Sequence, residues 1–198
     1  RDWSSDVCSS DLHEYPMNPE LLAIARAGAG YNNIPIEECA EKGIVVFNSP
    51  GANAEAVKEQ EIAALVMASR DMIGAIDWVR SIADCGDDIP EMVEKGKSSF
   101  AGPELQGKTL GVVGLGAIGA LVANAALDLG MVVYGYDPFM SVDAAWRLSR
   151  DVIRAEDVET IYEKSDYISI NIPHNDQTHN MFNDEAFAKM KMGVRIIN

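Results

Sequence analysis

Short apolar runs alternate with helical patterns along most of this chain. The runs that predict strands are residues 21–25, 44–47, 110–113, 131–136, 167–172 and 194–197. Gly, Pro, Asn or Asp residues bound these runs, and stretches with helical spacing of apolar residues separate them. Since strands that alternate with helices pair in parallel, we predict an α/β fold whose strands all end at one edge, where such folds bind ligands.

Besides the helix that follows the glycine motif described below, four stretches between these runs predict helices. They are residues 35–42, 54–82, 155–164 and 183–191. The first begins with Pro and has Gly43 behind its end, and Asn183 is placed to cap the last. The long helix is expected to be interrupted near Gly74. Residues 84–102 and 141–151 are polar and predict connections on the surface.

The long predicted helix carries an apolar stripe. Its members are Ile62, Leu65, Val66, Met72, Ile73 and Ile76. Their spacing places them on one helix face, which predicts the face that packs on the rest of the protein. Lys58 extends this stripe, so its ammonium group either reaches solvent past the first turn or points into a cleft.

Residues 110–119 read LGVVGLGAIG, a buried strand that runs into a glycine motif and then into a helix. In a dinucleotide-binding turn, Gly114 makes the turn, Gly116 lets the backbone approach a diphosphate, and Gly119 lets the helix pack closely on the strand. The helix N-terminus adds N–H donors and partial positive charge. The alternative is a glycine-rich turn in another kind of α/β protein.

Asp137 ends the next predicted strand, 18 residues after Gly119. A carboxylate in this place accepts hydrogen bonds from the ribose hydroxyls of an adenosine and repels the 2′-phosphate of NADP. The sequence therefore predicts NAD as the cofactor.

The composition excludes some classes of binding partner. The chain has 198 residues, enough for one large domain or two small ones, and a net charge of −15. A surface so negative repels nucleic acid and anionic membranes, so we expect neither as a partner. The three cysteines, Cys8, Cys39 and Cys85, show neither CxxC nor metal spacing. We therefore expect a reducing cytoplasm and no metal site.

Two further stretches allow alternative interpretations. Residues 109–127 carry no charged side chain and approach the length of a membrane span, but their four glycines and Asn124 fit a buried strand-turn-helix unit better. Residues 1–12, RDWSSDVCSSDL, lack either hydrophobic period and resemble the translation of a sequencing adapter. We expect a non-native leader, with a disordered native tail as the alternative.

Two loops follow the first two predicted strands. The first, residues 26–30, consists of Arg26 and small residues with exposed amide donors, and the second spans residues 48–53. Because these strands are expected to be parallel, both loops lie at the same edge. A guanidinium beside free amides suits a carboxylate or phosphate, and the alternative for Arg26 is an ordinary surface ion pair.

Three stretches together resemble one family. RAGAGYNN at residues 26–33, NSPGAN at 48–53, and GLGAIG with Asp137 are similar to the D-isomer-specific 2-hydroxyacid dehydrogenases and, among their branches, to the D-3-phosphoglycerate dehydrogenases of serine biosynthesis. The resemblance covers residues 13–198. It implies two partial α/β domains with the active site between them, and a homodimer or higher homo-oligomer built through the long helix.

We place the two implied domains along the chain. A partial flavodoxin-like substrate domain is expected over residues 13–70, and a partial Rossmann domain, the doubly wound parallel-sheet NAD-binding domain, over 71–198.

The resemblance also assigns residues to two ligands. The residues expected to line the NAD site are Ser49, Gly114, Gly116, Ala117, Ile118, Gly119, Asp137, Ile172 and Pro173. The residues expected to face the substrate are Arg26, Ala29, Gly30 and Asn53. Lys58 is either a further contact to an anionic substrate or a residue at the rim. Many relatives carry Arg or Lys at position 117, so Ala117 removes one side-chain contact to the diphosphate and leaves the backbone donors.

The reactive groups that the resemblance implies are an arginine that binds the 2-oxo acid and a histidine assisted by a glutamate. All three are expected beyond Asn198, so no catalytic residue is predicted here and residues 1–198 alone are expected to be inactive. His13 adjoins the predicted leader. His174 and His179 lie in a polar loop after a predicted strand, where a place at the cofactor rim or in solvent fits better than catalysis.

The expected activity is hydride transfer between NADH and a small 2-oxo acid, and 3-phosphohydroxypyruvate is the favoured substrate. Glyoxylate, hydroxypyruvate or D-lactate dehydrogenases are the alternatives among enzymes. A non-catalytic NAD-sensing protein of the corepressor kind shares this fold, and the presence of the histidine and glutamate would discriminate between the classes.

Overall fold

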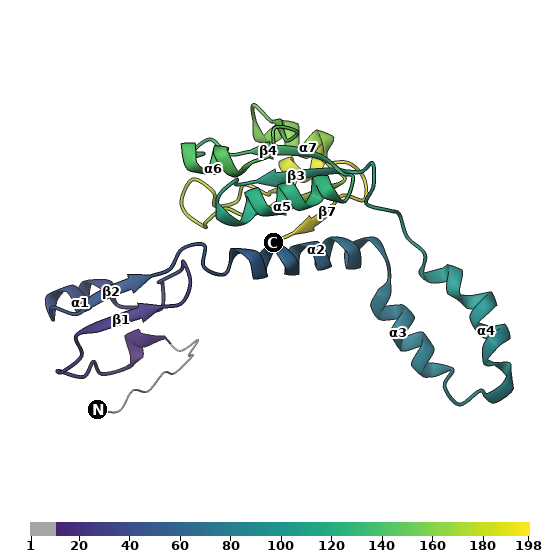
Figure 1. Ribbon diagram of the computed structural model, residues 1–198, viewed down its shortest axis with the longest axis horizontal. Coiled ribbons are helices and arrows are strands. Elements are labelled where there is room, and N and C mark those ends of the chain that lie inside the picture. The colour runs from purple at the N-terminus through teal and green to yellow at the C-terminus, as the bar shows by residue number, and fades with distance from the viewer. Residues whose placement is uncertain (1–10) are drawn as a thin grey trace. The chain divides into compact units, whose positions relative to one another are not determined.

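The computed structural model describes residues 11–198, which divide into two compact units joined at Asn53 and Ala54 (Figure 1). The predicted leader, residues 1–12, lies outside the described residues except for Asp11 and Leu12, and Cys8 lies outside them too. Leu12 packs against the core of the first unit, and its N–H donates to the Asn33 carbonyl at 2.8 Å.

The first unit is a small parallel βαβ arrangement. Its elements are η1 (Leu12–Glu14), β1 (Ala23–Arg26), α1 (Ile36–Glu41) and β2 (Val45–Asn48). β1 and β2 pair in parallel, with Arg26 opposite Asn48 at their carboxyl ends. The predicted order of strand, helix and strand is confirmed, and its core is formed by Ile34, Cys39 and Ile44, all buried.

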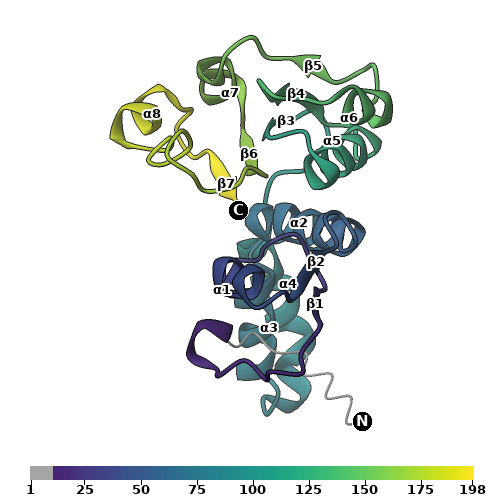
Figure 2. The same ribbon diagram turned by 90° about the vertical axis from the view of Figure 1, so that its left-hand side faces the viewer.

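The second unit holds a five-stranded parallel sheet in the order β5-β4-β3-β6-β7 (Figure 2). Its strands are β3 (Thr109–Val113), β4 (Val132–Tyr136), β5 (Ile153–Arg154), β6 (Tyr167–Ile170) and β7 (Arg195–Ile197). Its helices are α2 (Ala54–Ser69), α3 (Met72–Ser81), η2 (Gly86–Asp88), α4 (Ile89–Gly96), η3 (Lys97–Phe100), α5 (Ala117–Asp128), α6 (Val142–Arg147), α7 (Val158–Lys164) and α8 (Asp184–Lys189). The α/β fold predicted from the sequence is confirmed.

Helices cover both faces of this sheet. Leu110 and Val112 of β3 pack in one core cluster with Val122 of α5 and Leu65 of α2, whereas Val113 packs in a second cluster with residues of α7 and α8. Successive side chains of a strand point to opposite faces, so β3 needs apolar residues on both. This explains why the strand reads as an unbroken apolar run.

The long predicted helix is broken earlier than expected. It ends at Ser69, and Asp71 starts α3 by accepting a hydrogen bond from the Gly74 N–H at 2.9 Å. The interruption expected near Gly74 is therefore confirmed, and it falls a few residues before Gly74, which lies in the first turn of the new helix. A side-chain cap of this kind satisfies an N–H that would otherwise lack a partner.

The break also divides the predicted apolar stripe. Leu65 is only 1% exposed, but Ile73 is 60% and Ile76 is 49% exposed. The single continuous stripe is wrong, because α3 does not continue the axis of α2. The buried face of α2 is instead centred on Glu61, Leu65 and Ser69.

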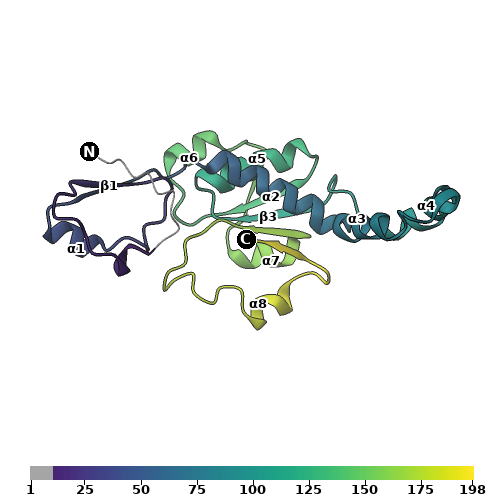
Figure 3. The same cartoon turned by 90° about the horizontal axis from the view of Figure 1, so that it is seen from below.

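Two stretches expected to be surface connections contain helices. Residues 84–102 hold α4, whose first turn contains Pro90, and residues 141–151 hold α6, capped by the Ser141 hydroxyl. Trp78 of α3 packs against Phe100 at 5.3 Å between ring centroids, which closes a helical hairpin that extends beyond the sheet (Figures 1 and 3). Neither helix contains a buried residue, and the Gly, Pro, Ser and charged residues of these stretches favoured connections instead.

The contacts place the boundary between the compact units at Asn53, rather than after residue 70. The reason is that α2 packs against α5 and contributes Leu65 to the core of the five-stranded sheet. Cys39 is buried, Cys85 is exposed, and both are free thiols.

No helix within residues 11–198 combines the length and the apolar character needed to cross a membrane. The uncharged stretch at 109–127 forms β3 and most of α5.

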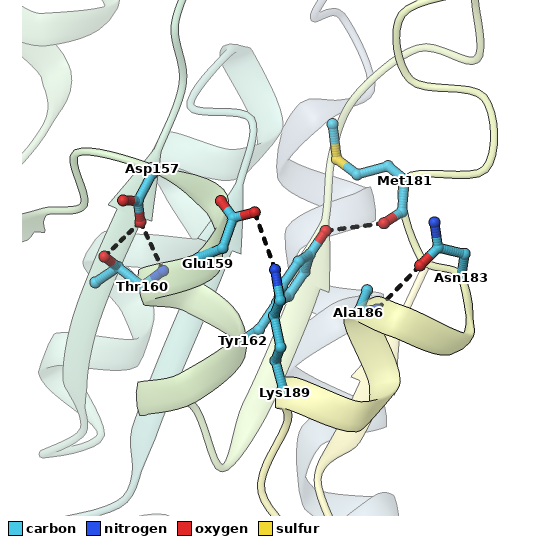
Figure 4. Close-up of polar contacts among 8 residues, drawn as sticks. All are labelled: Asp157, Glu159, Thr160, Tyr162, Met181, Asn183, Ala186 and Lys189. Atoms are coloured by element: carbon cyan, nitrogen blue, oxygen red, sulfur yellow. Dashed lines mark hydrogen bonds and ion pairs between the residues drawn. The ribbon is translucent and has the colours of Figure 1, made fainter.

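Helices α7 and α8 are joined by side-chain contacts (Figure 4). The Tyr162 hydroxyl donates to the Met181 carbonyl at 2.9 Å, and Lys189 pairs with Glu159 at 3.3 Å. Asn183 caps α8 by accepting a backbone N–H at 2.9 Å, as predicted. Burial, with a smaller effect from Glu159, raises the pKa of Tyr162 to about 12, so the phenol remains a donor at neutral pH.

We expect Tyr162→Phe to lower the free energy of unfolding by about 1 kcal/mol, because it removes one hydrogen bond and leaves the Met181 carbonyl without this donor. Urea unfolding followed by circular dichroism measures the change. Lys189→Ala is the control, since its exposed ion pair with Glu159 is worth less. A larger loss in the control than in Tyr162→Phe would contradict this expectation.

Candidate functional site

The glycine motif forms the turn between β3 and α5. Gly114 has a φ of 89°, a conformation that favours glycine, and its N–H donates to the Tyr136 carbonyl at 2.8 Å. A Cβ on Gly114 would lie 2.6 Å from the Asn171 carbonyl oxygen. The turn thus packs between the carboxyl ends of β4 and β6.

The other two glycines differ in what surrounds them. A Cβ on Gly119 would lie 1.8 Å from the Gly114 carbonyl oxygen, so Gly119 permits the helix to touch the turn. Gly116 meets nothing within 4 Å and precedes α5 without a side-chain cap. Ala117 is exposed and Ile118 is half-buried. The first turn of α5 therefore presents backbone N–H donors to an anion at an open surface.

Asp137 follows β4 and is held by one backbone N–H of the glycine turn and by one of its own loop. Its Oδ2 accepts the Leu115 N–H and its Oδ1 accepts the Phe139 N–H, each at 2.8 Å. It lines a pocket of about 290 Å³, which Arg154 and Glu156 also line. Nothing in the sequence points to Arg154 or Glu156 as pocket residues, because β5 has only two residues and gives no hydrophobic period.

The strand order reverses between β3 and β6, since β4 and β5 lie on one side of β3 and β6 and β7 on the other. Open α/β sheets bind ligands at such a switch point, outside the carboxyl ends of the strands. Ile172 lies there, with its Cγ2 2.8 Å from a Cβ placed on Gly114. Pro173 follows at an exposed position. The structure thus brings the predicted residues of β3, β4 and β6 together.

The first unit holds the other predicted residues. Ser49 donates its hydroxyl to the Arg26 carbonyl at 3.2 Å and accepts the Gly28 N–H at 3.0 Å, so the loops behind β1 and β2 are joined. Among the described residues, the amides of Ala29 and Gly30 make no hydrogen bond, and both residues are exposed.

Arg26 is the half-buried cation of this loop. Its Nη1 donates to the Ala27 carbonyl at 2.9 Å, while its Nε is buried and has no hydrogen-bond partner within residues 11–198. A buried donor without a partner is uncommon and calls for a ligand or water. Asn53 is exposed at the end of this unit.

Lys58 and the two loop histidines have partners of their own in the second unit. Lys58 pairs with Glu55 at 2.5 Å, and this hydrogen bond holds the pKa of Lys58 above its usual value. The rings of His174 and His179 contact each other at 3.1 Å between nitrogens, at the surface. Among the described residues, no group of three or more metal-ligating side chains occurs.

A family model matches residues 62–198, and its description is "D-isomer specific 2-hydroxyacid dehydrogenase, NAD binding domain". The D-3-phosphoglycerate dehydrogenase of Mycobacterium bovis is 36% identical over 180 residues, which cover 91% of this chain and 31% of that protein. The hydroxypyruvate reductase of Thermotoga maritima is 35% identical over 196 residues, which cover 98% of this chain and 58% of that protein.

Solved structures are similar as well. The D-lactate dehydrogenase from Aquifex aeolicus, solved in complex with NAD and lactic acid, superposes with a TM-score of 0.69 at 30% identity. The match covers 91% of this chain and 50% of that one. The chain thus spans about a third to somewhat more than half of these relatives. The prediction of NAD as cofactor is confirmed by the family match.

Proposed function

Since this chain belongs to the D-isomer specific 2-hydroxyacid dehydrogenases, we propose that the whole protein transfers hydride between NADH and a small 2-oxo acid, with 3-phosphohydroxypyruvate as its first substrate. The names of the mycobacterial relatives support this choice. Hydroxypyruvate is the second candidate, because a hydroxypyruvate reductase matches over nearly the whole chain.

The observation that carries the proposal is the fit of the glycine turn and Asp137 to a dinucleotide. Gly116 leaves open space where a side chain would stand, and the uncapped first turn of α5 supplies donors for a diphosphate. Asp137 is held by two backbone N–H groups and keeps acceptor capacity for ribose hydroxyls. When bound, NADH would supply the hydride that the carbonyl carbon of the 2-oxo acid accepts, and the chain supplies binding and orientation.

We assign the substrate to the first unit. The buried Nε of Arg26 and the exposed amides of Ala29 and Gly30 form a donor group suited to a carboxylate or a phosphate. Asn53 and Lys58 are further candidates, with Lys58 available to a substrate only if its pairing with Glu55 is exchanged. Ser49 is proposed to face the cofactor, although its hydroxyl also bonds within the loop.

We also propose a homodimer in the cytoplasm. The hairpin of α3 and α4 exposes apolar side chains, among them Ile73 at 60% and Val79 at 54%. A second copy of the chain would cover these side chains. The free thiols of Cys39 and Cys85 fit a reducing compartment.

The test is a steady-state assay of the full-length protein with NADH and, separately, 3-phosphohydroxypyruvate, hydroxypyruvate, glyoxylate and pyruvate. The highest kcat/KM is expected with 3-phosphohydroxypyruvate. Turnover of none of the four acids would overturn the proposal.

In the same assay we expect Arg26→Ala to raise KM for the 2-oxo acid about tenfold or more, because a hydrogen bond to a charged group is worth about 1.5–3 kcal/mol. The dissociation constant for NADH should change little, since the Arg26 side chain makes none of the hydrogen bonds that hold the glycine turn and Asp137. Lys42→Ala, which removes an exposed cation of the same unit, is the control. An unchanged KM for every acid would contradict the assignment of Arg26.

A further inference from the structure

Glu61 is a carboxyl group buried where a helix faces the end of a strand. It lies on the same face of α2 as Leu65 and Ser69 and is only 8% exposed. Its Oε2 accepts the hydroxyl of Ser169 in β6 at 2.5 Å. The side-chain amide of Asn171 donates to the Ser169 oxygen at 2.7 Å and also hydrogen bonds with Glu61.

Burying the Glu61 carboxyl group lowers the stability of the folded protein. Burial raises the pKa of Glu61 above its ordinary value of 4.5, although the hydrogen bonds from Ser169 and Asn171 act to lower it. The folded protein therefore binds this proton more tightly than the unfolded chain, and stability is lost as the pH rises through the raised pKa. No ion pair with Glu61 occurs among residues 11–198 to offset this loss. A leucine beside Leu65 would avoid the penalty.

The network ends at the proposed cofactor edge. The Asn171 N–H donates to the Val113 carbonyl at 2.8 Å, and its carbonyl oxygen lies against Gly114, 2.6 Å from where a Cβ would stand. Ile172 and Pro173 follow directly. Holding the Asn171 side chain therefore fixes the backbone at the point where β3, the strand before the glycine turn, meets the loop after β6.

The two sides of the switch point serve different halves of a dinucleotide. Asp137 and its pocket lie behind β4, on the side expected to hold the adenosine. Asn171 follows β6, on the opposite side of β3. We therefore expect it to lie beside the nicotinamide half.

We propose that Glu61 is a positioning residue for the cofactor, which holds the loop of residues 171–173 through Ser169 and Asn171 so that it forms a fixed wall for the nicotinamide half of NAD. Glu61 acts through this loop and has no direct part in hydride transfer. The inference rests on the cofactor assignment within the proposed function.

The test compares two ligands in the 198-residue chain, NADH and 5′-AMP, because AMP occupies only the adenosine half. Glu61→Leu removes the network, and Glu61→Gln keeps an acceptor for Ser169. Glu163→Leu, which replaces an exposed carboxylate of α7, is the control. Dissociation constants come from NADH fluorescence and from calorimetry with AMP, and thermal unfolding at pH 7.5 reports stability.

We expect Glu61→Leu to weaken NADH binding about tenfold and to leave AMP binding within about twofold, since one hydrogen bond to a charged group corresponds to about a factor of ten in an equilibrium. The variant should unfold at an equal or higher temperature. Glu61→Gln should bind NADH like the unchanged protein, and so should the control.

Two results would overturn the proposal. They are unchanged NADH binding in Glu61→Leu, and a parallel loss of NADH and AMP, which indicates general damage to the fold. If Glu61→Leu is insoluble, Ser169→Ala removes the route through Ser169 and leaves only the direct hydrogen bond between Asn171 and Glu61, so NADH binding must weaken while AMP binding does not. Failure of the unchanged chain to bind NADH would overturn the cofactor assignment itself and is seen before any variant is measured.

Discussion

Gly119→Ala is expected to lower the free energy of unfolding by about 2–3 kcal/mol and to abolish measurable NADH binding. The added methyl group would lie 1.8 Å from the Gly114 carbonyl oxygen, and that oxygen belongs to the backbone of the turn. Neither α5 nor the turn can move freely, since α5 packs on β3 and the Asn171 carbonyl confines the turn from the other side. The free-energy cost of this clash exceeds the roughly 1 kcal/mol by which alanine stabilises a helix interior relative to glycine.

Gly116→Ala is the matched control for this experiment. A Cβ at this position meets nothing within 4 Å, so the free energy of unfolding should stay within about 0.5 kcal/mol of the original. NADH binding should nevertheless weaken about tenfold or more, because the methyl group stands where the backbone must approach the diphosphate. Denaturant unfolding and NADH fluorescence separate the two effects. A fully stable Gly119→Ala, or a Gly116→Ala with unchanged affinity, would show that the turn does not act in this way.

Asp137→Asn is expected to reduce the discrimination against NADP about tenfold or more. In the original protein the carboxylate faces the 2′-phosphate as a like charge in a partly dehydrated pocket, which is worth about 1–3 kcal/mol. Asparagine removes this charge and keeps one oxygen for the Leu115 N–H, so the turn retains the hydrogen bond that Oδ2 now accepts. The bond to the Phe139 N–H is then left to water, which is acceptable at this exposed position.

The measurement is the ratio of dissociation constants for 2′-phospho-AMP and AMP, because a ratio cancels any general change in the fold. Arg154→Gln is the matched variant, since Arg154 lines the same pocket and attracts the 2′-phosphate. It should change the ratio in the opposite direction. Equal affinity for the two nucleotides in the original protein would contradict the role given to Asp137.

The succession of strands along the chain, the glycine turn and the acid that follows β4 could all be predicted from the sequence. Apolar runs bounded by Gly, Pro and Asn give strands, and the parallel pairing follows from the helices between them. Gly114 and Gly119 are recognisable because backbone packing at their positions leaves no room for a side chain. Such features are local, so the pattern along the chain carries them.

The contacts that each helix face makes are visible only in the folded structure. Asp71 starts a new helix and turns the apolar residues of α3 outward, which no count of apolar spacing could show. Glu61 was missed because a glutamate on an amphipathic helix is expected in solvent, whereas here its partners Ser169 and Asn171 lie more than a hundred residues away along the chain. Arg154 was missed for the same reason, since its place beside Asp137 exists only once β5 has paired with β4. Contacts between distant residues arise from packing, and a pattern read along one segment does not contain them.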